Sequence, residues 1–137
     1  MVTPYLVFNG NCKEVLEFYQ KVFGSKVEMS MPYGEYVPDG VKTIPANLST
    51  WVLHAEMQIC GTKLWFADEI RDLAKGDIVR LTATVPSRQG ADEIFNKLKD
   101  EITLPPTETF YSTFHASLID KFGIHWNIVA EEKPNQK

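Results

Sequence analysis

The sequence lacks basic clusters and long apolar runs. Lys and Arg together number 14 against 18 Asp and Glu, and the net charge is −4. With no basic patch, nucleic acid and anionic membrane surfaces are not expected partners. No apolar run approaches the roughly 20 residues that a membrane-spanning helix needs. The first residues also lack a charged segment followed by an apolar one, so no signal peptide is expected.

Cysteine is scarce as well. Cys12 and Cys60 are the two cysteines of the chain, too few for a disulfide scaffold. We therefore expect a cytoplasmic protein and read Cys12 as a small packed residue in the first turn of a helix. Hydrophobic residues make up 44% of the chain and charged residues 23%, which is typical of a globular protein.

The chain contains an internal repeat. His54-Ala55 follows a Ser-Thr pair and precedes a hairpin glycine, and His115-Ala116 is preceded and followed in the same way. Upstream, Asn11 and Ser87 each begin an amphipathic run. A doubled module limits the possible folds strongly.

Each half is predicted to be a βαβββ module, and the whole chain an α+β protein. We expect one domain over residues 1–137, with module one at 1–69, a linker at 70–76, module two at 77–132 and a polar tail at 133–137. Gly24 should end the first helix. Residues 32–48 hold three prolines and two glycines and are expected to form a long functional loop. The expected strands are Tyr5–Phe8, Lys26–Met31, Trp51–Ile59 and Lys63–Ala67, then Ile78–Val85, Thr107–Phe110, Phe114–Ile119 and His125–Ala130.

Alternation along the strands assigns their two faces. In the segment Leu53–Ile59, every second residue is apolar and should pack on the helix. The opposite face carries His54, Glu56 and Gln58. This face is polar in several strands, so it is either a solvent-exposed surface or the lining of a cleft.

Short motifs follow one another along the chain: Thr3–Asn11, Glu17-Phe18-Tyr19, Val22-Phe23-Gly24, His54-Ala55, and Leu118–Gly123 with Trp126. Their order resembles the vicinal-oxygen-chelate superfamily, which includes glyoxalase I, bleomycin-resistance proteins and extradiol dioxygenases. The resemblance is closest to its PhnB-like branch, also described as 3-demethylubiquinone methyltransferase-like. Lys121 stands where the branch usually has proline. The resemblance implies an open, cupped sheet with helices outside, commonly a homodimer, and no single reaction.

Metal-dependent members of the superfamily hold a divalent ion on the first and last strands of each module. Aligning the helix starts puts those positions at Pro4, Trp65, Arg80 and Asn127. Proline and tryptophan are not ligands, an arginine repels a metal ion, and asparagine is a weak ligand by itself. We therefore expect no catalytic metal and no other cofactor.

The remaining candidates are polar or aromatic residues of the non-helix face. His54 and His115 hold matched positions and suit acid/base chemistry, or they are inherited repeat residues bonded within the sheet. Glu56 could orient His54, and Arg80 could clamp an anionic group or be a solvated surface charge. Trp65 would supply an aromatic wall. The predicted ligand-binding set is His54, Glu56, Trp65, Arg80, His115, His125 and Asn127.

These features favour a metal-free small-molecule-binding protein that forms a homodimer. The first alternative is an enzyme, either a lyase or isomerase using His54 or His115, or a metal-dependent glyoxalase or dioxygenase. The second is a resistance protein that sequesters a toxic compound unchanged. The sequence leaves open the ligand, whether any reaction is catalysed, and whether modules pair within or between chains.

Overall fold

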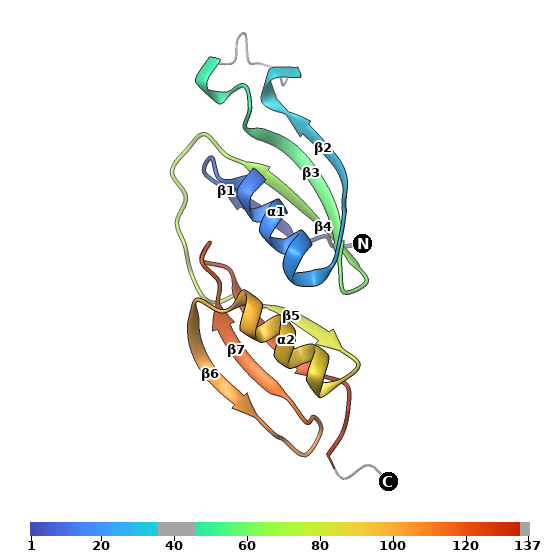
Figure 1. The fold of residues 1–137 in the computed structure, drawn as a ribbon. Coiled ribbons are helices and arrows are strands. Elements are labelled where there is room, and N and C mark those ends of the chain that lie inside the picture. Colours follow the sequence, from blue (N-terminus) through green and yellow to red (C-terminus); the bar gives the residue numbers. More distant parts are fainter. Residues whose placement is uncertain (36–45, 135–137) are drawn as a thin grey trace. The chain divides into compact units, whose positions relative to one another are not determined.

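The computed structural model describes residues 1–35 and 46–134, which fall into two compact units (Figure 1). Unit 1 covers Met1–Ala74 and unit 2 covers Lys75–Lys137. Each unit is a four-stranded mixed sheet with one helix, so the predicted α+β fold of two βαβββ modules is confirmed.

Unit 1 places its first and last strands side by side. Its sheet has the order β1-β4-β3-β2, with β1 and β4 parallel and the other neighbours antiparallel. The loop between β2 and β3 contains two short 3₁₀ turns, η1 and η2. The elements are β1 (Tyr5–Phe8), α1 (Cys12–Phe23), β2 (Val27–Pro32), η1 (Tyr33–Glu35), η2 (Ala46–Leu48), β3 (Val52–Ile59) and β4 (Thr62–Asp68).

Unit 2 repeats this arrangement. Its sheet has the order β5-β8-β7-β6, again with a parallel pair, β5 and β8, and antiparallel neighbours elsewhere. The elements are β5 (Leu81–Val85), α2 (Arg88–Leu98), β6 (Glu101–Thr107), β7 (His115–Ile119) and β8 (His125–Ala130).

The ends of the two helices follow local chemistry. Gly24 closes α1 in the left-handed conformation with φ of 66°, which costs glycine little. The Ser87 side chain accepts a hydrogen bond from the backbone N–H of Gly90 at 3.0 Å and so caps α2. Asn11 holds the N-cap position of α1 but makes no side-chain cap bond. The Asp68 carboxylate takes that role, accepting from the N–H of Cys12.

A two-residue turn, Cys60-Gly61, joins β3 to β4. Both residues have positive φ, 50° and 87°, as the favoured two-residue hairpin turns require. The turn fixes the β3–β4 register, with Ile59 opposite Thr62.

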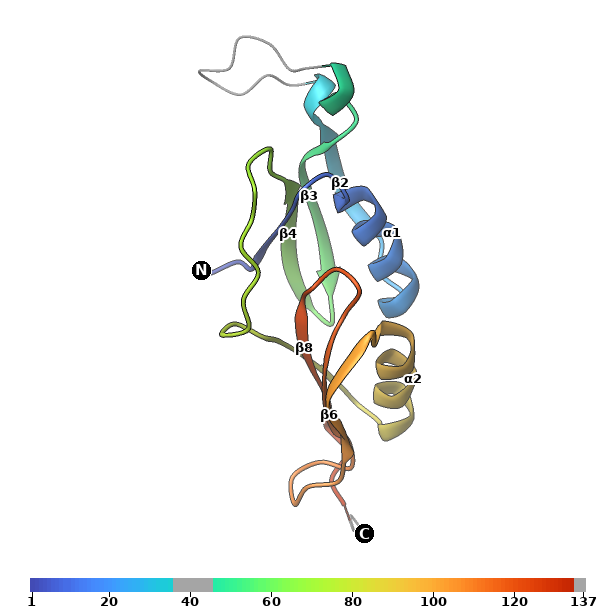
Figure 2. The same cartoon turned by 90° about the vertical axis from the view of Figure 1, so that its left-hand side faces the viewer.

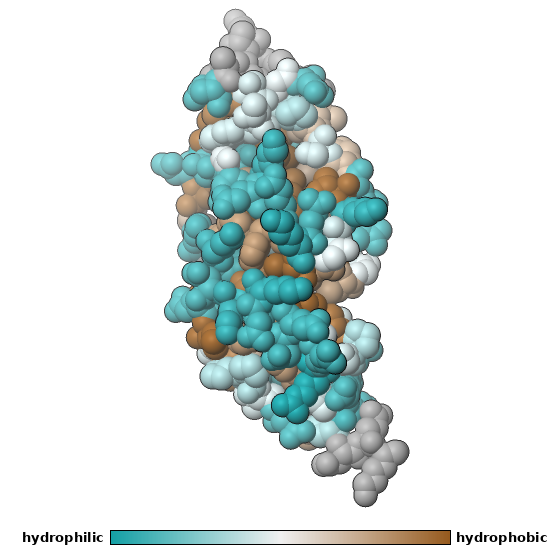
Figure 3. All heavy atoms as spheres, viewed as in Figure 1, coloured by the Kyte–Doolittle hydropathy of each residue, from teal (hydrophilic) through white to brown (hydrophobic). Residues whose placement is uncertain are grey.

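In each unit the helix covers one face of the sheet (Figure 2). Ala55, Met57 and Ile59 of β3 are buried, as the alternation predicted, whereas Leu53 of the same predicted set is only half-buried. In β8 the buried set is Trp126, Ile128 and Ala130, with intervening residues partly exposed. The outward faces of both helices are largely hydrophilic (Figure 3), so each helix is amphipathic with its apolar side on the sheet.

Several boundaries differ from the sequence expectation. The strand predicted at Ile78–Val85 begins at Leu81, and Ile78 and Val79 are exposed. The second strand of module two is Glu101–Thr107, earlier than the predicted Thr107–Phe110, because an edge strand tolerates the two prolines it contains. Of the expected loop at 32–48, residues 36–45 lie outside the described part of the chain.

Candidate functional site

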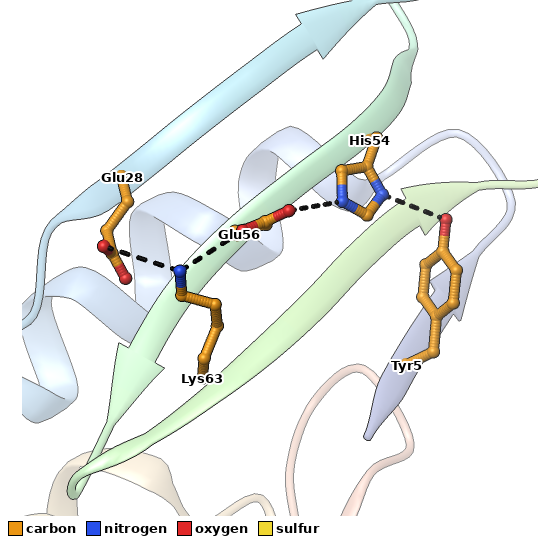
Figure 4. A network of polar contacts seen from close by, with 5 residues as sticks. All are labelled: Tyr5, Glu28, His54, Glu56 and Lys63. Carbon is orange, nitrogen blue, oxygen red and sulfur yellow. Dashed lines mark hydrogen bonds and ion pairs between the residues drawn. The ribbon is translucent and has the colours of Figure 1, made fainter. Parts of the chain in front are cut away.

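A chain of polar contacts crosses the non-helix face of the unit 1 sheet (Figure 4). The Tyr5 hydroxyl lies 3.2 Å from His54 Nδ1, and His54 Nε2 lies 2.9 Å from Glu56 Oε2. Lys63 Nζ continues the chain, 3.5 Å from Glu56 Oε1 and 3.9 Å from Glu28 Oε2. The five side chains come from all four strands, so the sheet itself positions them.

Three aromatic rings meet at one end of this network. The His54 and Trp65 ring centroids are 4.9 Å apart, and Tyr5 lies 5.7 Å from His54 and 5.6 Å from Trp65. All three pairs are edge-to-face, an arrangement that aromatic quadrupoles favour. We call the set Tyr5, His54, Glu56 and Trp65 the sheet-face site.

The carboxyl of Glu56 has a shifted pKa. The hydrogen bond from His54 lowers the pKa of the Glu56 carboxyl below its usual range, and Lys63 lowers it further, while burial acts in the opposite direction. The side chains of His54 and Glu56 are 21% and 22% exposed, so the pair is within reach of a ligand. Glu56 is therefore an ionised acceptor that fixes the imidazole.

Strand register explains why these residues meet. Trp65 pairs with Tyr5 on one side and with Glu56 on the other, so three side chains form a row across the sheet. The sequence alignment took Pro4 and Trp65 as the two ligand positions of module one, whereas the residue that pairs with Trp65 is Tyr5. Because Leu6 and Phe8 of β1 are buried, period-two alternation already places Tyr5 on the non-helix face.

The matching row in unit 2 is Thr82, Asn127 and Ser117. The Ser117 hydroxyl donates to Asn127 Oδ1 at 2.7 Å, and Asn127 Nδ2 donates to Thr82 Oγ1 at 3.3 Å. The sequence alignment took Arg80 and Asn127 as the two ligand positions of module two, whereas the residue that pairs with Asn127 is Thr82. Arg80 is exposed and precedes β5.

His115 and His125 lie at separate places in unit 2. His115 Nδ1 is 2.7 Å from the Tyr111 hydroxyl, which repeats the Tyr5–His54 contact with a tyrosine from a loop. His125 opens β8 and lines a cavity of about 470 Å³ with Lys75, Gly76, Asp77, Ile119 and Gly123. The predicted set is therefore divided: His54, Glu56 and Trp65 come together in unit 1, and the other four residues belong to unit 2.

A metal of the glyoxalase type does not fit the residues at the expected positions. Register places Tyr5, Trp65, Thr82 and Asn127 there, a set with no carboxylate or imidazole. Within residues 1–35 and 46–134, no three His, Cys, Asp or Glu side chains are grouped closely enough to hold a metal ion.

Sequence reasoning missed Asp68, which anchors the end of β4 near the site. Its carboxylate is 2% exposed and accepts from the backbone N–H groups of Gly10, Cys12 and Val52 at 2.9, 3.0 and 2.9 Å. These bonds join β4 to the start of α1 and to β3. Lys63, Glu28 and Tyr111 were also missed, because only strand pairing or a loop path reveals their contacts.

Two other features fall outside the predicted set. A cavity of about 560 Å³ at the start of α2 is lined by Arg88, Gln89, Asp92, Pro106, Thr107, Glu108, Thr113, Phe114 and Glu132. It holds none of the predicted site residues.

Cys12 is fully buried, and burial, then the charge of Asp68, raises the pKa of its thiol. It is therefore a packed residue, as expected, and a poor nucleophile.

Known proteins resemble this chain over nearly its whole length. The Escherichia coli (strain K12) protein YjdN is 27% identical over 146 residues, covering 98% of this chain and 99% of YjdN. Protein PA1353 from Pseudomonas aeruginosa shares 25% identity with a TM-score of 0.82, covering 96% of this chain and 97% of PA1353. A putative 3-demethylubiquinone-9 3-methyltransferase, PhnB protein, from Bacillus cereus has a TM-score of 0.74 at 21% identity, covering 94% and 98%.

Proteins with lower sequence identity also share this fold. The fosfomycin resistance protein FosX from Listeria monocytogenes matches with a TM-score of 0.65 at 10% identity, covering 96% of this chain and 93% of FosX. In the part of the chain that the structure describes, no helix is both long and apolar enough to cross a membrane. The sequence pattern described as 3-demethylubiquinone-9 3-methyltransferase matches residues 1–129. The chain therefore belongs to this PhnB-like family and has the vicinal-oxygen-chelate fold.

Proposed function

We propose that this chain is a small-molecule-binding protein whose ligand lies against the sheet-face site and needs no catalytic metal. The observation that carries the proposal is the grouping of His54 and Glu56, each about one-fifth exposed, beside the rings of Tyr5 and Trp65. Binding sites commonly combine an apolar or aromatic wall with a few convergent polar groups.

The chemistry of the site favours a flat ligand with at least one polar group. Edge-to-face or offset contact with an aromatic ring is worth about 0.5–1.5 kcal/mol beyond the area it buries. Tyr5 is 47% exposed, so part of its side chain is open to such a ligand. Contact with the aromatic rings would contribute to the affinity of the ligand, and a hydrogen bond to the Tyr5 hydroxyl would fix its orientation.

The proposal also includes the four candidates of unit 2. Arg80 would bind an anionic group of the ligand, because an exposed guanidinium offers five donors in a rigid plane. His125 borders a cavity, Asn127 lies in a hydrogen-bonded row, and His115 has a tyrosine partner. A homodimer is part of the same proposal, and the exposed edge strand β6 supports it.

A ligand library tests this function by thermal shift on protein dialysed against a chelator. Any compound that binds the folded state raises the unfolding temperature. We expect flat aromatic compounds with a hydroxyl or acidic group to stabilise the wild type, and Trp65→Ala to lose the shift. Phe110→Ala is the control, because Phe110 is an exposed aromatic in unit 2. The proposal fails if such ligands stabilise only metal-loaded protein, or stabilise Trp65→Ala as well as the wild type.

An enzyme remains the second candidate, and one observation favours it. His54 has a hydroxyl at one ring nitrogen and a carboxylate at the other, an arrangement that activates acids, bases and nucleophiles in many enzymes. A lyase or isomerase is consistent with this arrangement. The metal-dependent glyoxalase or dioxygenase alternative has weaker support, because the donor set does not suit a metal.

A further inference from the structure

The order of groups in the sheet-face site is hydroxyl, imidazole, carboxylate. Tyr5 Oη is 3.2 Å from His54 Nδ1, and Glu56 Oε2 is 2.9 Å from Nε2 on the opposite side of the ring (Figure 4). The carboxylate end continues to Lys63, whereas the hydroxyl end belongs to the most exposed of the three residues. A ligand would therefore meet the hydroxyl first.

Charge decides which ring nitrogen of His54 carries the proton. Ionised Glu56 only accepts hydrogen bonds, so the neutral imidazole must hold its proton on Nε2 and donate it to the carboxylate. Nδ1 then has a lone pair and accepts from the Tyr5 O–H. The low pKa of Glu56, caused first by the His54 bond and then by Lys63, maintains this arrangement at neutral pH.

We propose that Tyr5, His54 and Glu56 form a proton relay, and that the Tyr5 hydroxyl exchanges a proton with a bound small molecule carrying an acidic O–H or C–H on a flat, unsaturated body. This inference rests on the proposed binding function and adds its chemistry. Tyr5 is the group that touches the ligand, while His54 and Glu56 act through it.

The step balances without a co-reactant. The ligand's acidic bond breaks, its proton joins the Tyr5 oxygen, and the Tyr5 proton moves to His54 Nδ1. The ligand becomes an anion, and His54 becomes an imidazolium whose Nε2–H stays bonded to Glu56. Reversal returns the proton to the same or another ligand atom, so exchange or isomerisation results. The charge created on His54 is opposite to that of Glu56, which stabilises it.

The relay is needed because Tyr5 alone is a poor base. Burial, then the charge of Glu69, raises the pKa of the Tyr5 hydroxyl, so the phenol stays protonated at neutral pH. Transfer to His54 lets the oxygen accept a proton without first becoming a free phenolate. In other hydroxyl–imidazole–carboxylate sites, the imidazole likewise accepts the hydroxyl proton and the carboxylate orients the imidazole.

Unit 2 provides an internal comparison. Tyr111 and His115 repeat the hydroxyl–imidazole contact at 2.7 Å. The residue matched to Glu56 is Ser117, whose hydroxyl donates to Asn127 instead. Within residues 1–35 and 46–134, no carboxylate contacts His115 Nε2, so only His54 has a carboxylate that holds its proton on Nε2.

The relay itself is tested without any ligand, by long-range proton–nitrogen NMR of the full chain labelled on histidine. At neutral pH we expect the Nε2–H tautomer at His54, a shifted Nδ1 signal in Tyr5→Phe, and loss of the tautomer preference in Glu56→Gln. Tyr111→Phe is the matched control and should shift only His115. A Nδ1–H tautomer at His54, or an unchanged Nδ1 signal in Tyr5→Phe, overturns the relay.

Proton exchange with a ligand is tested with 4-nitrophenol, whose protonated and anionic forms absorb differently. We expect bound probe to be enriched in the anion at constant pH. Tyr5→Phe should bind at least about tenfold more weakly, the loss of one hydrogen bond to a charged group, and should lose the enrichment. Glu56→Gln should lose it too, and Glu93→Gln, an exposed carboxylate on α2, should keep it. Binding without enrichment refutes the inference alone, whereas absence of binding refutes the ligand class of both proposals.

Discussion

Replacing Asp68 with alanine should destabilise unit 1 strongly. The carboxylate accepts three backbone N–H bonds, from Gly10, Cys12 and Val52, and the last two donors are buried. Each buried donor left without a partner costs about 1–3 kcal/mol, and bonds to a charged acceptor are at the upper end of hydrogen-bond strengths. We expect a loss of about 3–5 kcal/mol, a large part of the roughly 5–15 kcal/mol that holds a typical domain folded.

Urea unfolding followed by circular dichroism measures this loss, and amide exchange at Cys12 and Val52 assigns it to unit 1. Asp120 offers a matched variant in unit 2, because its carboxylate accepts from the N–H groups of Phe122 and Ile124 and from the Trp126 indole. Asp100→Ala, at an exposed residue, should change stability by less than about 0.5 kcal/mol. A change below about 1 kcal/mol in Asp68→Ala would refute the reasoning.

Three further predictions concern the site and its assembly. Because the pKa of Glu56 is lowered in the folded protein, its bond to His54 stabilises the fold above the ordinary carboxyl pKa of about 4.3, and this stabilisation is lost as pH falls through the lower folded pKa. In Glu56→Gln, the free energy of unfolding should therefore fall less steeply as the pH is lowered, which urea unfolding at several pH values measures. Light scattering should show a dimer of the 15.6 kDa chain, and a purely monomeric sample at micromolar concentration contradicts this. Arg80→Ala should weaken the binding of an anionic ligand by about 1.5–3 kcal/mol, measured by calorimetry, and leave the free energy of unfolding unchanged. Equal affinity of the wild type and the variant for the ligand would exclude Arg80 from the site.

The fold was largely predictable because the signals that specify it are local. The helix stop at Gly24, the Ser87 cap and the Cys60-Gly61 turn each depend on a few neighbouring residues, and alternation assigned the β3 faces. The predicted strand ends were wrong at β6, which is an edge strand and therefore tolerates proline. The sequence pattern does not show which backbone N–H groups of a strand need a partner, so it does not reveal that the prolines are allowed there.

The site was predictable only in part. His54, Glu56 and Trp65 were identified from their face and lie together. Tyr5 was missed because the modules were aligned on their helices, and a one-residue shift changes the face on which a side chain lies. Lys63 joins Glu56 through a hairpin register that periodicity alone does not give.

The buried carboxylates were missed for a different physical reason. Asp68 and Asp120 satisfy backbone N–H groups from segments brought together by the fold, and nothing in the neighbouring sequence distinguishes them from surface aspartates.

The central claim is that a small molecule binds the sheet-face site without a metal. Chemical-shift mapping tests it most directly, with isotopically labelled full chain dialysed against chelator and titrated with a compound that stabilises the protein thermally. We expect the largest changes at the Trp65 indole N–H, the His54 ring and the Tyr5 backbone. Unmoved signals at these residues while the ligand binds, or binding that appears only after metal is added, would contradict it.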